Sequence, residues 1–104
     1  MFINGKLVIN NEAVECEYKE NNFIKYKDDD ALNIVDIKNT TYIRENNEFI
    51  FKIEFKNKKF SYTLNENNLK LEDNLSCEFA INSNGILIKY NLDDEEKEII
   101  IHLL

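Results

Sequence analysis

Residues 48–64, with the sequence EFIFKIEFKNKKFSYTL, alternate between apolar and polar side chains over most of their length. One row of apolar side chains recurs at every second position: Phe49, Phe51, Ile53 and Phe55. After the polar step 56–59 the alternation resumes with Phe60, Tyr62 and Leu64. Successive side chains of a β-strand point to opposite faces, so a period of two indicates strands with one apolar face.

The polar step divides the stretch into two halves of similar length, which is typical of a β-hairpin. A turn at Asn57-Lys58 would place Phe55 opposite Phe60. Residues that lie opposite each other on paired strands share a face of the sheet, so both apolar rows would lie on the same side. The sequence therefore predicts one apolar inner face to which further strands are added.

Nine other stretches have strand character, and polar turns rich in Asn and Asp separate them. With the hairpin, the expected strands are 3–9, 12–19, 23–27, 32–38, 41–45, 48–55, 58–64, 68–72, 75–81, 86–92 and 97–103. We find no amphipathic helical stretch of useful length. Short strands at nearly constant spacing predict an all-β antiparallel meander, hence a barrel or a sandwich, in a single domain over residues 1–104.

Three further turns agree with the hairpin about which face is inside. Asn84-Gly85 is a preferred pair for a two-residue type I′ turn, and loops are expected over 65–68 and within 93–96. The pairs predicted to lie opposite each other are Ile81 with Ile88, Leu64 with Leu69, and Leu92 with Ile99. Agreement among independent turns supports a single inner face.

The N-terminal half leaves two questions open. Cys16 shares a face with Tyr26 only if the loop around Asn21-Asn22 has an odd number of residues. The strand expected at 32–38 has two alternative inner faces, Leu32 with Ile34 or Val35 with Ile37.

Composition limits the partners and the compartment. The formal charge of −7 opposes binding to nucleic acid, which requires an excess of basic side chains. The start, MFINGK, lacks the features of a signal peptide, and no apolar run approaches the roughly 20 residues that span a bilayer. Two cysteines without CxxC spacing indicate reduced thiols. We therefore expect a cytoplasmic protein that binds neither nucleic acid nor membrane.

Two segments, NIVDIKNTTYIRENN at 33–47 and GILIKYNLDDEEKEIIIHLL at 85–104, resemble the YwiB-like bacterial β-barrel family, which is calycin-like and of unknown function. Arg44 lies where that family tends to have an Arg before a turn, and Tyr90 lies in the Ile-x-Tyr of a late strand. The chain has Asn46-Asn47 where relatives favour Gly. The resemblance implies an antiparallel meander that closes into a calycin-like barrel of eight to ten strands.

Arg44, the only arginine, is the leading candidate for a binding residue. A two- or four-residue loop around Asn46-Asn47 would pair Arg44 with Phe49 and Tyr42 with Phe51, so both would face inward. A buried guanidinium needs a partner. That partner is either Asp36 or a ligand carboxylate, with Tyr62 or Tyr90 adding a hydroxyl donor. The candidate ligand-binding residues are Arg44, Tyr42, Tyr62 and Tyr90.

No arrangement of residues indicates catalysis or metal binding. His102, the only histidine, is expected to point outward, and Cys16 and Cys77 are expected to be buried and unreactive. The acidic clusters at 28–30 and 93–96 lack calcium-loop spacing and fit solvated turns. The sequence therefore predicts no enzyme, no catalytic residue, no metal site and no cofactor.

Two functions remain. In the first, the protein is a non-enzymatic binder of a small apolar or carboxylate ligand held in the barrel lumen. In the second, the barrel is a filled scaffold that acts through a protein–protein surface, with a homodimer as one form. The outward side chains of Ile50, Leu87 and Ile100 would form that surface.

Overall fold

The computed structural model describes residues 3–19, 22–83 and 85–103, and these contain eleven β-strands and no helix. The strands are β1 (Ile3–Ile9), β2 (Glu12–Lys19), β3 (Phe23–Lys27), β4 (Leu32–Asp36), β5 (Thr41–Glu45), β6 (Phe49–Glu54), β7 (Lys59–Leu64), β8 (Leu69–Asn74), β9 (Cys77–Asn82), β10 (Gly85–Leu92) and β11 (Glu95–Leu103). The predicted all-β antiparallel meander is confirmed, and each of the eleven stretches predicted as strands overlaps one of them. The barrel implied by the family resemblance would have had eight to ten strands.

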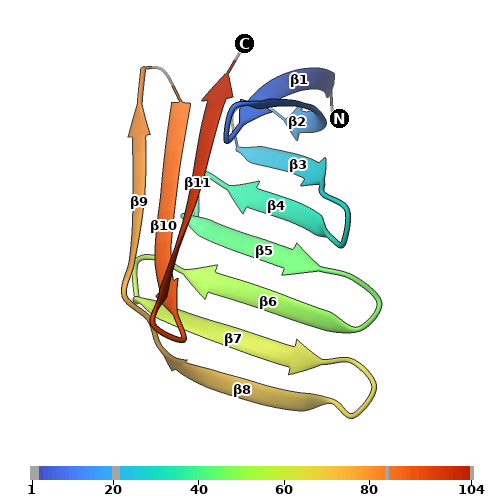
Figure 1. Cartoon of the computed structure of the whole chain (residues 1–104), viewed down its shortest axis with the longest axis vertical. Helices are drawn as coiled ribbons and strands as arrows, with labels where there is room; N and C mark the ends of the chain where they lie inside the picture. Colours follow the sequence, from blue (N-terminus) through green and yellow to red (C-terminus); the bar gives the residue numbers. More distant parts are fainter. Residues whose placement is uncertain (1–2, 20–21, 84, 104) are drawn as a thin grey trace.

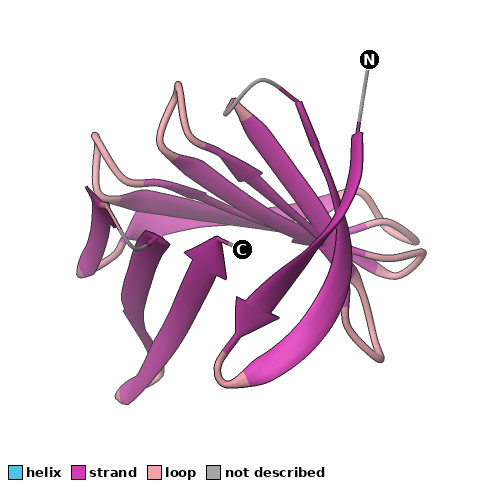
Figure 2. Ribbon diagram, turned by 90° about the horizontal axis from the view of Figure 1, so that it is seen from above, coloured by secondary structure: helices cyan, strands magenta, loops and turns pink. Residues whose placement is uncertain are grey.

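All eleven strands belong to one antiparallel sheet in the order β8-β7-β6-β5-β4-β3-β2-β1-β11-β10-β9. Strands β1 and β11 pair with each other, so the first and last strands of the chain are neighbours inside the sheet and not at its edges. Strands β8 and β9 form the two edges, although they follow each other in sequence. The sheet curls into an open half-barrel (Figures 1 and 2), so the predicted closure into a calycin-like barrel is not seen among these strands.

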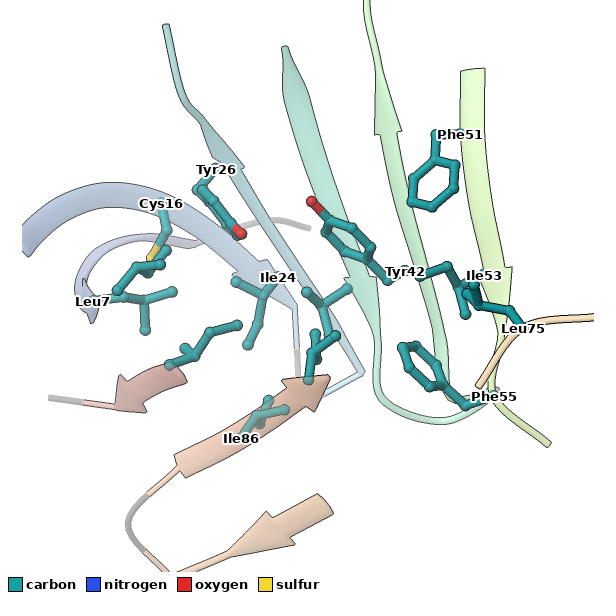
Figure 3. Close-up of a cluster of buried hydrophobic side chains, with 14 residues drawn as sticks. Leu7, Cys16, Ile24, Tyr26, Tyr42, Phe51, Ile53, Phe55, Leu75 and Ile86 are labelled. Atoms are coloured by element: carbon teal, nitrogen blue, oxygen red, sulfur yellow. The ribbon is translucent and has the colours of Figure 1, made fainter. Parts of the chain in front are cut away.

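The curl brings the β9–β11 part of the sheet across the inner face of the other part (Figure 1). Three ring contacts join these layers: Phe51 to Tyr90, with ring centroids 5.6 Å apart, Tyr42 to Tyr90, at 6.3 Å, and Phe55 to Phe79, at 5.2 Å. Aliphatic side chains fill the space between the layers, and Ile53, Ile88 and Ile101 are fully buried. Figure 3 shows this cluster between β2–β6 and β10. The interior of the half-barrel is therefore a packed core.

The predicted inner face is confirmed, but the register of the first hairpin is wrong by two residues. Ile53, not Phe55, lies opposite Phe60, because the loop consists of residues 55–58. Phe55 remains buried within that loop. A shift of two residues leaves every side chain on the same face, so the core prediction survives the error.

Of the other three predicted pairings, one is correct, one is shifted by two residues and one by four. Leu64 lies opposite Leu69 as predicted. Ile81, however, lies opposite Ile86, because Asn82 pairs with Gly85. Gly85, predicted as a turn residue, is therefore the first residue of β10, and Asn84 lies outside the described residues.

The third pairing is shifted by four residues, because Asp93 and Asp94 form a two-residue hairpin turn between Leu92 and Glu95. Both aspartates have positive φ, 54° and 63°, as a type I′ turn requires. Ile99 consequently lies opposite Ile88. The inner face of β11 therefore begins with the charged residues Glu95 and Lys97.

Both open questions of the N-terminal half are answered by the pairing of β2, β3 and β4. Cys16 lies opposite Tyr26, as an odd-length loop requires; Asn21 lies outside the described residues. Val35 is fully buried, whereas Leu32 and Ile34 are only half-buried. The same parity turns Asn33 inward, where its side chain is almost completely buried.

The proposed outward surface of Ile50, Leu87 and Ile100 is divided between separate parts of the sheet. Leu87 and Ile100 lie opposite each other on β10 and β11. Ile50 is on β6, whose neighbours are β5 and β7. These three residues do not form one patch on adjacent strands.

Candidate functional site

Arg44 projects from β5 onto the inner face, opposite Phe51 rather than the predicted Phe49. The shift of two residues again preserves the face. The guanidinium lies 5.8 Å from the centre of the Phe49 ring, a cation–π arrangement. Its side chain is 29% exposed, so it lies at the mouth of the half-barrel rather than in the packed core.

The partner of Arg44 is Asp28, in the loop between β3 and β4. Arg44 donates from Nε to Asp28 Oδ2 at 3.1 Å and from Nη2 to Asp28 Oδ1 at 3.2 Å. Asp30 lies farther away, with its carboxylate 3.8 Å from Nη2. The predicted partner Asp36 is wrong: its carboxylate accepts hydrogen bonds from Asn39 and caps the β4–β5 turn.

Asp28 also organises its own loop. Its Oδ1 accepts hydrogen bonds from the backbone N–H groups of Asp30 and Ala31, each at 2.9 Å, which is the pattern of an Asx turn. Its Oδ2 accepts a further bond at 2.9 Å from Asn33 Nδ2. One carboxylate therefore ties the loop, β4 and β5 together.

Asn33 and Tyr42 extend this network into the core. The Tyr42 hydroxyl donates to Asn33 Oδ1, and the two residues are each only 1% exposed. Asn33 thus connects a buried phenol to the carboxylate of Asp28 at the surface. Every buried side-chain nitrogen and oxygen among the described residues has a hydrogen-bond partner.

The network fixes the charges at the site. Partial burial would raise the pKa of Asp28, but hydrogen bonds from Arg44, Asn33 and the loop backbone outweigh it and lower this pKa to about 2. The hydrogen bond to Asp28 raises the pKa of Arg44. Both residues are consequently ionised across the physiological pH range.

Three tyrosines surround the network, one each from β3, β5 and β10. The Tyr26 and Tyr42 hydroxyls point toward one another (Figure 3), and the rings of Tyr42 and Tyr90 are 6.3 Å apart. Burial raises the pKa of all three phenols. Burial therefore favours the neutral phenol at all three positions, and each hydroxyl can donate one hydrogen bond.

These groups line a cleft of about 810 Å³ between the inner face of β3–β5 and the strands β10 and β11. Its apolar walls include Ile9, Val14 and Ile99 together with the three tyrosine rings. Its charged residues are Glu12, Lys27, Asp28, Asp29, Arg44, Lys97 and Glu98. The cleft thus combines apolar surface with a polar rim of nearly balanced charge.

A larger hollow, of about 1110 Å³, lies against β1–β4. Its lining mixes the inward side chains of Cys16 and Tyr26 with exposed residues such as Ala13 and Glu15. Neighbouring residues on a strand point to opposite faces, so this space extends around the sheet and is not enclosed by one face. The cleft at Arg44 is the better-defined site.

Three of the four predicted site residues, Arg44, Tyr42 and Tyr90, meet at the cleft. Tyr62 shares their face but lies on β7, outside the cleft lining, where its ring stacks on Phe49 at 5.6 Å. The prediction missed the contributions of Tyr26, Asp28, Asn33 and Lys97. The role of Asn33 could have been predicted, because it lies two residues before Val35 on the same strand and so shares its inner face. A buried amide on that face needs polar partners.

The histidine and the two cysteines do not line this cleft. His102 is exposed, as predicted. Cys16 and Cys77 are free, and burial raises the pKa of both thiols, which disfavours the nucleophilic thiolate. Residues 3–19, 22–83 and 85–103 contain no group of three or more His, Cys, Asp or Glu side chains arranged to hold a metal ion.

No protein-family model, curated protein or solved structure matches this chain. Within the described ranges, no helix is present that could cross a membrane.

Proposed function

We propose that this protein is a non-enzymatic binder of a small ligand, which it holds in the cleft at Arg44. The observation that carries the proposal is the convergence of three tyrosines and Arg44 on one cleft of about 810 Å³. That volume is within the roughly 300–1,000 Å³ typical of small-molecule sites, which are mainly apolar with a few placed polar groups. The sequence predicted a ligand in the barrel lumen. Because side chains fill the interior, we place the ligand instead in this cleft at the mouth of the half-barrel.

The charges of the cleft favour an uncharged ligand head over a carboxylate. Asp28 already neutralises Arg44 through two hydrogen bonds, and Asp30 lies close to the same guanidinium. An incoming carboxylate would have to approach these two negative charges. The Tyr42 hydroxyl already donates to Asn33, so the protonated hydroxyls of Tyr26 and Tyr90 supply the donors for a neutral acceptor such as an amide or ketone carbonyl. The apolar body of the ligand would lie against Ile9, Val14 and Ile99.

The proposal is tested with decanamide, decanoate and decylamine, which share an alkyl chain and differ in the head group. Isothermal titration at neutral pH should show that decanamide binds more tightly than either charged probe, decanoate or decylamine. Tyr90→Phe removes one hydroxyl from the cleft and should weaken decanamide binding by about tenfold, the value of one hydrogen bond of roughly 1.4 kcal/mol.

Tyr62→Phe is the matched control, because it removes a hydroxyl from the same face outside the cleft. Binding of decanamide should be unchanged in this variant. No detectable binding of any of the three probes, together with no retained ligand in native mass spectra of the purified protein, would rule out the proposed function.

A further inference from the structure

Strand β8 is an open edge of the sheet. It pairs with β7, and no other described strand pairs with it. In Figure 1 it lies at the bottom, with no segment of the chain beyond it. All six of its residues are exposed. An edge of this kind presents unpaired backbone groups to another strand.

Three leucines next to this edge are exposed although they lie on the inner face. Leu64 is 36% exposed, Leu69 61% and Leu71 60%, and we call these three residues the leucine patch. Leu69 lies opposite Leu64, and Leu71 lies opposite Tyr62. The strands β9–β11 cross the opposite ends of these strands (Figure 1), so the leucine patch stays uncovered.

The register with β7 determines which backbone groups of β8 are unpaired. Just beyond β8, the Leu75 N–H donates to the Lys58 carbonyl at 2.8 Å. Hydrogen-bonding direction alternates along an antiparallel strand, so residues 69, 71 and 73 direct their backbone groups to β7. The N–H and C=O groups of Lys70 and Glu72 therefore point to the free edge.

We propose that two copies of this chain form a homodimer by antiparallel pairing of β8 with β8, about a two-fold axis at Leu71. In this register Lys70 of each copy forms a hydrogen-bonded pair with Glu72 of the other, which gives four backbone hydrogen bonds. The same register places the Lys70 ammonium opposite the Glu72 carboxylate twice, on the outer face. On the inner face the two Leu71 side chains meet, and the two leucine patches become continuous.

Charge selects this register and this edge. Shifting one copy by two residues in either direction places Lys70 opposite Lys70 or Glu72 opposite Glu72, which is repulsive. The other edge strand, β9, carries Glu78 as its one charged residue, so pairing of β9 with itself brings no opposite charges together. Within one copy Lys70 and Glu72 already form an ion pair at 2.8 Å, with both side chains more than half exposed and able to turn to a second copy.

Sedimentation velocity over a concentration series from about 1 μM to about 1 mM tests the dimer. The wild-type protein should convert from monomer to dimer as concentration rises. Leu71→Arg places two like charges at the axis and should raise the dissociation constant at least about tenfold. Ile81→Arg alters the exposed apolar residue of the β9 edge and should leave the dissociation constant unchanged.

A charge exchange tests the register. Lys70→Glu and Glu72→Lys should each weaken self-association, because each creates two repulsive pairs. An equimolar mixture of the two variants should recover the wild-type affinity, because every pair between the unlike chains is then attractive. A wild-type protein that stays monomeric throughout, a dimer that Ile81→Arg disrupts, or a mixture that stays monomeric would each overturn the proposal.

Discussion

Asp28 and Arg44 are joined by two hydrogen bonds in a side-by-side arrangement, with Nε 3.1 Å from Oδ2 and Nη2 3.2 Å from Oδ1. The two residues are sixteen positions apart in sequence, and the pair connects the β3–β4 loop to strand β5. Because the same carboxylate also binds Asn33, a surface ion pair and a buried phenol belong to one network. The cleft is built around this network.

Tyr42→Phe should destabilise the protein. The substitution removes the only proton donor recorded for Asn33 Oδ1 among the described residues, in a position that is 1% exposed. A buried acceptor left without a partner costs about 1–3 kcal/mol. Chemical denaturation should show this loss in the free energy of unfolding. Tyr62→Phe, at a half-buried residue, is the control and should change it by less than about 0.5 kcal/mol.

Because of Asp28, the free energy of unfolding should depend on pH under acidic conditions. Its pKa is about 2 in the folded protein, below the usual value of 3.8, so the folded state favours the ionised carboxylate more than the unfolded state does. Its contribution to stability is fully present above about pH 4 and is lost as the pH falls toward 2. We expect the free energy of unfolding of the wild type to decrease across this window.

The Asp28→Asn variant isolates that effect, since an amide does not titrate. It should be less stable than the wild type at pH 7, and the difference should shrink as the pH falls toward 2. A constant difference between the two proteins from pH 7 to pH 2 would show that the Asp28 carboxylate does not stabilise the fold through its charge.

Thr40→Gly should stabilise the protein. Thr40 ends the four-residue loop between β4 and β5 with φ of 50°, a left-handed conformation that is unfavourable for a β-branched residue. Relief of this strain, of about 1–2 kcal/mol, exceeds the entropy cost of glycine, of about 0.5–1 kcal/mol. The melting temperature should rise. Asn39→Gly in the same loop should lower it, because Asn39 donates a side-chain hydrogen bond to Asp36.

The period of two predicted the strands and the inner face, because a strand with one buried face must place its apolar residues at alternate positions. The same period cannot distinguish registers that differ by two residues. Ile53 opposite Phe60 and Phe55 opposite Phe60 place the same side chains inside. The choice between them depends on loop conformation, such as the positive φ of Lys58 at the end of its loop.

The candidate site was predictable only in part, for a related reason. The alternation of side chains predicted that Arg44, Tyr42 and Tyr90 lie on the inner face, but it predicted the same for Tyr62. It does not determine which inner-face residues come into contact when the sheet curls. Asp28 lies in a loop, where no periodicity applies, and its pairing with Arg44 depends on the Asx turn that folds the loop back over β4. Closure of the sheet depends on whether β8 and β9 meet, which the alternation of apolar residues does not determine either.

The binding site is tested most directly by mapping chemical-shift changes in the ¹H–¹⁵N spectrum of the labelled protein during titration with decanamide. We predict that the largest changes occur at Tyr26, Asn33, Arg44, Tyr90 and Lys97. These residues line the cleft but come from five different strands. Changes concentrated at Leu64, Leu69 and Leu71, or a spectrum that does not change at saturating probe, would contradict the assignment of this cleft as the binding site.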